Sequence, residues 1–594
     1  MCGFIGCVSF KEIESANLQK ANLFSKCRGP DDTSQLTHKS DINYDLWFNR
    51  LAIVDLNSNA NQPMVSESQG SVLMFNGEIY NANKLRKKNT EYNFLTSHSD
   101  TETLLAGLDQ FGINFINELE GQFSFFYMNK IMKKIYLVRD RVGQKPLYFS
   151  CKSSSLNFAS NLKSLLIYEK KFDIDQESID QYISFGVNFS PTTLFKDIFK
   201  LSPGTFAEVD YSTGKFILKT KEYWNPKSFI DEKPFNQSEF IEILSDSVEK
   251  RTIADVEIAN FLSGGIDSTS IVKNLHDLDK PINTFSVIMN NDRYNEKEFI
   301  DEVVKKFNTN HSEVLIDEKL SNDLITKSLQ SLDEPYGDPS VVPSFYLSNL
   351  ISSEFKVAIS GDGGDELLGG YKRLKNFFSN KNALTNFISI AYKIYPSFLG
   401  TGTNLQSKNK NKFIAYKSFL EDKKFNNLLR EKDNYKDINM NNFENEINYK
   451  DILLFEYEHY LSDQMMFKVD RTSMANSLEV RSPFVDHNLI EYIFSHSNEY
   501  LTTGIQKEPL RNYLSANFDE NFLDRPKQGF VFDYQSWVYS NIDYIFEIVM
   551  NSKINTYISL NSLNKIKLFK SRINALRIWR IFVLANYLNE INDL

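Results

Sequence analysis

The sequence predicts two kinds of fold in succession. The first is an α+β sandwich of antiparallel sheets with helices, and the second is an α/β doubly wound parallel sheet with a helical C-terminal part. Short β runs bounded by Gly, Asn or Asp dominate about the first 210 residues. Strand and helix patterns alternate from about residue 236, and helical patterns prevail beyond residue 370. With 594 residues, the chain is long enough to bury such large cores.

Composition narrows the class of protein. Hydrophobic residues make up 41% and charged residues 24%, which excludes a disordered or fibrous chain. A net charge of −10 argues against nucleic acid as a partner, because phosphate binding needs clustered Lys and Arg. The four cysteines form no CxxC pair, so neither a zinc site nor a disulfide scaffold is indicated. Without a signal peptide or an apolar run of about 18 residues, we expect a cytoplasmic protein with no membrane partner.

The predicted sandwich occupies residues 1–211. Its strand signals are LWFNRLAIVDL, SVLMFNGEIYN, GQFSFFYMN and KKIYLVRD, each apolar and rich in Val, Ile, Phe and Tyr. One helix, DTETLLAGLDQFG, has acidic residues in its first turn and ends near Gly112. Residues 212–235, with Gly214, Pro226 and Pro234, are the predicted linker to a second domain at 236–594.

The second domain shows the order typical of βαβ units. A helix (SEFIEILSDSVEKRT) precedes a strand (DVEIANFL), a helix (IDSTSIVKNLHDL) and a strand (TFSVIM). A further helix and the strand FKVAIS follow, and this strand runs into a glycine turn. Such alternation predicts a parallel, doubly wound sheet.

Cys2 is a candidate nucleophile. Removal of Met1 would leave an α-amino group beside the thiol, and this amine can act as the base. An amide-cleaving thiol needs an oxyanion hole, which Asn76 and the Gly77 N–H could supply. Arg50 could bind a substrate carboxylate and Asp100 an ammonium group. Taken singly, a buried cysteine and a surface ion pair are the plainer interpretations.

The order of five motifs favours a catalytic Cys2 over these plainer interpretations. RGPDD, RLAIVD, NGEIYN, SDTE and RDRVGQKPLY follow Cys2 in a sequence that resembles the glutaminase domain of class II, N-terminal-nucleophile glutamine amidotransferases. The resemblance implies that Cys2, Asn76 and Gly77 are catalytic. It also implies a glutamine site formed by Arg50, Leu51, Ile53, Val54, Asn76, Gly77, Glu78 and Asp100.

A second motif, FLSGGIDSTS, predicts a phosphate-binding turn. A buried strand, two glycines and a helix start place backbone N–H groups around an anion, although a plain glycine turn is the alternative. No Walker sequence is present. The string SGGIDS resembles the pyrophosphate loop of the ATP-pyrophosphatase fold. This implies ATP contacts at Phe261, Leu262, Ser263, Gly264, Gly265, Asp267, Ser268, Val287, Ser360 and Gly361.

A third motif, ISGDGGDELLGGY, places Asp362, Asp365 and Glu366 close together after a strand. Such carboxylates suit Mg²⁺ with ATP or a cationic substrate, and an acidic helix start is the structural alternative. We predict Asp267 and Asp365 as metal ligands and Asp362 as catalytic. Lys527, in RPKQGF, could neutralise charge on a transferring phosphoryl group, although such a lysine is more often solvated.

Together the motifs resemble glutamine-hydrolysing asparagine synthetases over essentially the whole chain. The resemblance implies the substrates glutamine, aspartate and ATP with Mg²⁺, an adenylated intermediate, and internal transfer of ammonia; a homodimer is possible. One departure is SGDGGDE, where better-known members carry SGEGSDE. It leaves open amidation of another carboxylate, such as a sugar acid or a peptide. A β-lactam-forming synthetase and a non-catalytic glutamine- or ATP-binding protein are further alternatives, which the intact Cys2 and phosphate loop disfavour.

Overall fold

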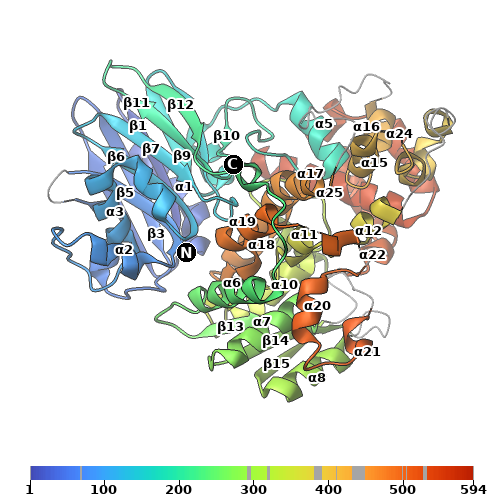
Figure 1. Cartoon of the computed structure of the whole chain (residues 1–594). Coiled ribbons are helices and arrows are strands. Elements are labelled where there is room, and N and C mark those ends of the chain that lie inside the picture. Colours follow the sequence, from blue (N-terminus) through green and yellow to red (C-terminus); the bar gives the residue numbers. More distant parts are fainter. Residues whose placement is uncertain are drawn as a thin grey trace.

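The computed structural model describes most of the chain. The described residues are 2–66, 70–289, 296–316, 321–379, 391–409, 411–430, 448–497, 499–502, 505–525 and 532–592. Figure 1 shows the strands of the N-terminal part gathered on one side and the helix-rich C-terminal part on the other. Within the described residues, no helix is long and apolar enough to cross a membrane.

The N-terminal part is a sandwich of antiparallel sheets, as predicted. In the described residues two six-stranded sheets have the orders β10-β8-β9-β1-β3-β2 and β12-β11-β7-β6-β5-β4. The strands are β1 (Gly3–Ser9), β2 (Asp32–His38), β3 (Asn43–Arg50), β4 (Met64–Val65), β5 (Val72–Ile79), β6 (Gly121–Asn129), β7 (Lys134–Arg139), β8 (Tyr148–Lys152), β9 (Ser155–Ala159), β10 (Phe199–Lys200), β11 (Thr205–Asp210) and β12 (Ile217–Glu222).

Alternating side chains hold the layers of this sandwich together. Phe4 of β1 and Met74 of β5 lie in one apolar cluster between the two sheets. Leu73 and Phe75 point to the other face of β5 and pack on Leu104 of α3 (Asp100–Phe111). This alternation is the period of two expected for strands that are buried on both faces. Helices cover both outer faces: α1 (Ser15–Asn22) and α4 (Leu162–Glu169) on one, α2 (Ala82–Lys88) and α3 on the other.

The second part contains the predicted parallel sheet. Its order in the described residues is β15-β14-β13-β16-β17, and all neighbours are parallel. Because the chain extends the sheet first in one direction and then in the other, the order reverses between β13 and β16. The strands are β13 (Ile258–Phe261), β14 (Asn283–Met289), β15 (Asn310–Ile316), β16 (Val357–Ile359) and β17 (Glu479–Arg481).

Helices make up most of the remaining described chain. Around the sheet and beyond it lie α5 (Gln176–Phe185), α6 (Gln237–Lys250), α7 (Ile266–Asp277), α8 (Lys297–Phe307), α9 (Asn322–Gln330), α10 (Val341–Ile351), α11 (Gly364–Leu368), α12 (Lys372–Ser379), α14 (Thr403–Gln406), α15 (Lys412–Lys417), α16 (Lys423–Arg430), α17 (Tyr449–Phe455), α18 (Phe467–Met474), α19 (His487–Ser495), α20 (Glu508–Leu514), α21 (Glu520–Leu523), α22 (Tyr534–Ser540), α23 (Ile542–Asn551), α24 (Leu560–Leu568) and α25 (Arg572–Asn592). A π-helix, Glu456–Met466, joins α17 to α18.

The predicted linker, residues 212–235, is not entirely connecting chain. Residues Ile217–Glu222 form β12, which pairs with β11 at the edge of the second sheet. The strand escapes prediction because ILKTKE is polar and mostly exposed, as edge strands often are. The domain boundaries at residues 211 and 236 stay a prediction.

Two candidate active sites

All of the residues predicted to bind glutamine except the fully buried Asn76 line one pocket. Its wall contains Cys2, Arg50, Leu51, Ile53, Val54, Gly77, Glu78 and Asp100. Cys2 directly precedes β1, Gly77 lies on β5, and Asp100 begins α3. Three segments far apart in the sequence therefore meet at one cavity.

Cys2 is held by its backbone against Asn76. The Cys2 N–H donates to Asn76 Oδ1 at 3.0 Å, and Asn76 is fully buried on β5. Asn76 Nδ2 has no hydrogen-bond partner among the described residues. A buried donor without a partner is costly unless a ligand accepts from it, so this amide suits an oxyanion. Burial raises the pKa of the Cys2 thiol, which therefore needs a base to become a nucleophile.

Gly77 is required by close backbone contact. A Cβ at this position would lie 2.1 Å from the carbonyl oxygen of Gln122 on the neighbouring strand β6. Its φ of 159° lies at the limit of what L-residues adopt. The strand can therefore bring its backbone to the edge of the pocket only with glycine here.

Two buried carboxylates, those of Glu78 and Asp100, also line the pocket. The N–H groups of Ile79 and Thr101 donate to Asp100 at 3.1 and 2.7 Å, and burial raises the pKa of Asp100 to about 6. Burial and the neighbouring Asp100 raise the pKa of Glu78 well above its usual range. Arg481 of β17 lies 3.3 Å from Glu78 and supplies a compensating charge. A bound ammonium group would relieve the repulsion between the two carboxylates.

Arg50 is fixed by a loop of its own domain. Its Nη1 donates to the Asn57 carbonyl at 2.8 Å and to Asn61 Oδ1 at 2.7 Å. The guanidinium is therefore pre-oriented at the pocket wall, as recognition of a planar carboxylate requires.

The second candidate site lies where the parallel sheet reverses its strand order. The SGG turn follows β13, Gly264 has a φ of 65°, and α7 begins at Ile266 as predicted. The SGDGG turn follows the neighbouring strand β16. A Cβ on Gly361 would lie 2.9 Å from the Asp267 Cβ, so the two turns are packed directly against each other. The carboxyl ends of the strands at such a reversal of order are the usual ligand site of doubly wound sheets.

The predicted ATP-binding residues fall into two groups, those that form hydrogen bonds within the SGG turn and those that are buried or partly buried. Ser263 and Ser268 organise the turn itself: their hydroxyls are 3.2 Å apart, and the Ser263 hydroxyl accepts from the Gly265 N–H at 3.2 Å. Leu262 is buried in the apolar core, so only its backbone can approach a nucleotide. Phe261 and Val287 are partly buried near the strand ends. Ser360 is buried and its N–H donates to the Arg481 carbonyl.

Asp267 and Asp365, the predicted metal ligands, converge on one cation. The ammonium group of Lys507 contacts both carboxylates, with Asp365 Oδ1 at 2.6 Å. In the described residues, no group of three or more His, Cys, Asp or Glu is placed to hold a metal. Two carboxylates that already attract one cation fit Mg²⁺, which takes one or two such ligands and completes its shell with water and substrate phosphates.

Sequence reasoning missed two cationic residues at this site. Lys507, in IQKEPLR, carries no pattern that distinguishes it from a surface lysine. Arg525 lies beside the SGG turn, with Nη2 3.5 Å from the position of a Cβ on Gly265, and its Nη1 has no hydrogen-bond partner within the described chain. Lys527 falls outside the described residues, so its predicted role is neither supported nor contradicted.

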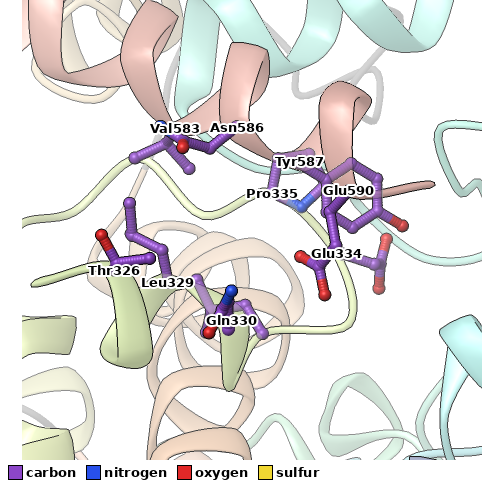
Figure 2. A pocket seen from close by; sticks show the side chains of 10 residues that line it. Thr326, Leu329, Gln330, Glu334, Pro335, Val583, Asn586, Tyr587 and Glu590 are labelled. Atoms are coloured by element: carbon purple, nitrogen blue, oxygen red, sulfur yellow. The ribbon is translucent and has the colours of Figure 1, made fainter. Parts of the chain in front are cut away.

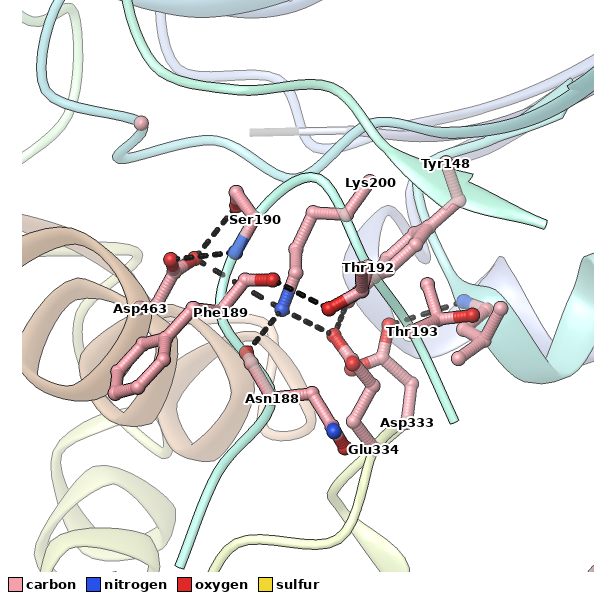
Figure 3. Close-up of polar contacts among 12 residues, drawn as sticks. Tyr148, Asn188, Phe189, Ser190, Thr192, Thr193, Lys200, Asp333, Glu334 and Asp463 are labelled. Atoms are coloured by element: carbon pink, nitrogen blue, oxygen red, sulfur yellow. Dashed lines mark hydrogen bonds and ion pairs between the residues drawn. The ribbon is translucent and has the colours of Figure 1, made fainter. Parts of the chain in front are cut away.

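Buried ion pairs connect the two parts of the molecule. Arg28 Nε donates to the Cys2 carbonyl at 3.2 Å, while its two terminal nitrogens bind Asp470 of α18 at 2.8 and 3.0 Å. Arg471, the next residue, donates from Nη2 to the hydroxyl of Tyr148 on β8 at 2.5 Å. Figure 3 shows the adjoining cluster, in which Lys200 lies 3.0 Å from Glu334. Tyr148 donates to the same carboxylate at 2.6 Å, so the sandwich is fixed to the helical part by charge as well as packing.

A separate small cavity lies between α9 and α25. Figure 2 shows its lining, which includes Glu334, Pro335, Tyr587 and Glu590. The residues that line it include none of the predicted site residues. It therefore adds nothing to either candidate site.

Comparison with known proteins agrees with this arrangement. The family model for asparagine synthase matches residues 239–569, more than half of the chain, and a glutamine amidotransferase domain model matches residues 1–224. Asparagine synthetase [glutamine-hydrolyzing] 1 of Bacillus subtilis is 29% identical over 94% of this chain and 91% of its own length. A putative asparagine synthetase [glutamine-hydrolyzing] 2 of Methanocaldococcus jannaschii is 32% identical over 62% of this chain and 76% of its own. The chain belongs to the asparagine synthase family.

Proposed function

We propose that this chain is a glutamine-dependent asparagine synthetase with two active sites. The observation that carries the proposal is that one chain holds both a thiol and paired carboxylates in one pocket and a second carboxylate pair beside a phosphate turn. The first site suits release of ammonia from an amide, and the second suits activation of a carboxylate by ATP.

In the first site, Cys2 Sγ attacks the side-chain amide carbon of glutamine. A γ-glutamyl thioester forms, ammonia leaves, and water then releases glutamate. Asn76 Nδ2 and the Gly77 N–H bind the developing oxyanion. Arg50 binds the substrate carboxylate, Glu78 and Asp100 bind its ammonium group, and Leu51, Ile53 and Val54 enclose it.

In the second site, the side-chain carboxylate of aspartate attacks the α-phosphorus of ATP and pyrophosphate leaves. Ammonia then attacks the β-aspartyl-AMP and AMP leaves, which gives asparagine. The N–H groups of the SGG turn and Arg525 bind phosphate oxygens, and Asp267 and Asp365 would hold Mg²⁺, which neutralises phosphate charge when bound. Asp365 contacts Lys507 and Glu366 accepts from Tyr371, so we assign the catalytic role to Asp362. Lys527 stays our choice for neutralising charge on the leaving group.

Pyrophosphate release tests this proposal. The enzyme is supplied with Mg-ATP and glutamine, with and without aspartate, and the products are identified by mass spectrometry. Pyrophosphate that depends on aspartate, with asparagine as the product, is the expected result. A folded enzyme that forms neither glutamate from glutamine nor pyrophosphate in response to aspartate would contradict the proposal.

A second acceptor class is favoured by one observation. Asp362 stands in SGDGGDE, where the better-known family pattern has the longer glutamate. The shorter side chain sets its carboxylate back by one methylene and leaves more room beside the adenylation site. Glutaminase activity without aspartate-dependent pyrophosphate would therefore direct the same assay to sugar acids and peptide carboxylates.

A further inference from the structure

Lys507 occupies the position where a metal would be expected. Its ammonium group contacts Asp267, which lies in the first turn of α7, and Asp365, which lies in the first turn of α11. These carboxylates follow two neighbouring strands of the parallel sheet, β13 and β16. The two acidic groups would repel each other without a cation between them.

The lysine is held in place rather than reaching in from solvent. Its side chain is only 7% exposed, and it precedes α20 with φ 55° and ψ 39°. This left-handed conformation is sterically unfavourable for a residue with a Cβ and persists only where the surrounding structure holds it. Leu514 of α20 and Val272 of α7 share one apolar cluster, so the helix that follows Lys507 packs on the helix carrying Asp267.

The lysine and a divalent cation compete for the same oxygens. Mg²⁺ binds carboxylate oxygens at about 2.0–2.1 Å and cannot share them with an ammonium group in contact. Because the Lys507 side chain is buried, an ammonium group displaced from the carboxylates needs a new anionic partner. The phosphates of a nucleotide are such a partner, and free Mg²⁺ brings none.

We propose that Lys507 holds the place of the divalent cation between Asp267 and Asp365 until a nucleotide binds. The metal then enters together with the triphosphate, and the Lys507 ammonium moves from the carboxylates to phosphate oxygens. Lys507 is thus a positioning residue that keeps the two ligands together and rejects free metal. This inference rests on the proposed ATP site and does not depend on the identity of the acceptor.

Mn²⁺ binding to the full chain without nucleotide tests the inference. Free Mn²⁺ is followed by electron paramagnetic resonance for the wild type, Lys507→Met and Lys507→Gln. Removing the competing charge should tighten Mn²⁺ binding about tenfold or more, because the binding-competent state is no longer a minor one. With ATP present, the wild type should bind Mn²⁺ more tightly than the variants, because the variants lack the ammonium group that contacts the phosphates. A merely structural lysine would weaken Mn²⁺ binding in both conditions.

Two controls define the site. Lys273→Met removes a lysine of α7 that pairs with Asp277 at 2.6 Å, and it should leave Mn²⁺ binding unchanged. Asp267→Asn combined with Lys507→Met should abolish the increase in Mn²⁺ affinity that Lys507→Met causes. Equal Mn²⁺ affinity in wild type and both Lys507 variants, or no binding by any of them, would overturn the inference. Either result together with normal pyrophosphate release would leave the proposed function intact. Tighter Mn²⁺ binding by the variants, without any pyrophosphate release by the wild type, would contradict only the proposed function.

Discussion

Asn76 connects the backbone of Cys2 to the predicted oxyanion site. Its Oδ1 accepts from the Cys2 N–H, and its Nδ2 has no partner in the described part of the chain. The same side chain therefore orients the candidate nucleophile and presents a donor near it. Preorganised donors of this kind act without reorganisation when charge develops on the substrate.

Cys2→Ala should separate the two nitrogen sources. The variant lacks the thiol needed to form the thioester, so glutamine-dependent pyrophosphate release and glutamate formation should both stop. Ammonium-dependent pyrophosphate release should persist, because the second site contains no group from Cys2. Loss of activity with both nitrogen sources would contradict the two-site proposal.

The affinity for glutamine should depend on pH through the buried carboxylates. Asp100 has a pKa raised to about 6, and a carboxylate binds an ammonium group only when ionised. In the inactive Cys2→Ala enzyme, glutamine affinity should therefore rise as the pH increases through about 6. Below that pH it should fall by about tenfold per unit, the slope of a single proton.

Calorimetric titration of Cys2→Ala with glutamine measures this profile. Adding Asp100→Asn should weaken binding and flatten the part of the profile that Asp100 causes. A dissociation constant that is the same on both sides of about pH 6 would show that neither Glu78 nor Asp100 titrates on binding.

At the scale of elements, the sequence pattern predicts the helices and strands that bury a face and misses a strand that is mostly exposed. β5 and α3 follow from an apolar run and an acidic helix start, and both are present. β12 was missed because most of its residues are exposed. The candidate glutamine site was predictable because motifs carry its residues. Lys507 and Arg525 were not, since their importance comes from the tertiary contact of α20 and the 525 segment with the two turns.

Gly361→Ala should separate the two turns of the second site. The new Cβ would lie 2.9 Å from the Asp267 Cβ and 3.2 Å from the Ser268 N, and it would push the SGDGG turn away from α7. We expect pyrophosphate release to fall by about a hundredfold with either nitrogen source, as for a reacting group displaced by about 1 Å. Glutamate release from glutamine should be affected far less.

Gly214→Ala is the matched control for this substitution. A Cβ at Gly214 meets no atom within 4 Å, although its φ of 75° also carries a backbone cost of about 1 kcal/mol. It should lower the melting temperature slightly and leave pyrophosphate release unchanged. Wild-type rates in Gly361→Ala would remove the contact between the turns from the catalytic argument.

At the scale of the whole molecule, one residue of β17, Arg481, contacts both candidate sites. Arg481 lies 3.3 Å from Glu78 through its side chain, and its carbonyl accepts from the Ser360 N–H at 2.9 Å. Arg28 links the Cys2 carbonyl to Asp470 on α18, the helix that precedes β17. The candidate glutamine pocket is therefore completed by charges from the parallel-sheet part of the chain.

Asp470→Asn tests this dependence. The substitution leaves Arg28 and Arg471 beside a neutral amide, and all three side chains are at most 4% exposed. Loss of one partner from a buried ion pair costs about 3–5 kcal/mol, so the melting temperature should fall by several degrees. Because Arg28 also holds the Cys2 carbonyl, glutamine-dependent synthesis should fall about tenfold to a hundredfold. Ammonium-dependent synthesis should lose much less.

The control for Asp470→Asn is an ion pair that spans the same two parts but is exposed to solvent. Lys356 and Asp31 lie 2.8 Å apart with side chains 40% and 31% exposed, so Lys356→Met should cost at most about 1 kcal/mol. Its ratio of glutamine-dependent to ammonium-dependent synthesis should equal that of the wild type. If Asp470→Asn lowers both activities equally, the buried pair stabilises the fold without positioning Cys2. A selective loss with glutamine means that the parallel-sheet part of the chain sets the geometry of the nucleophile.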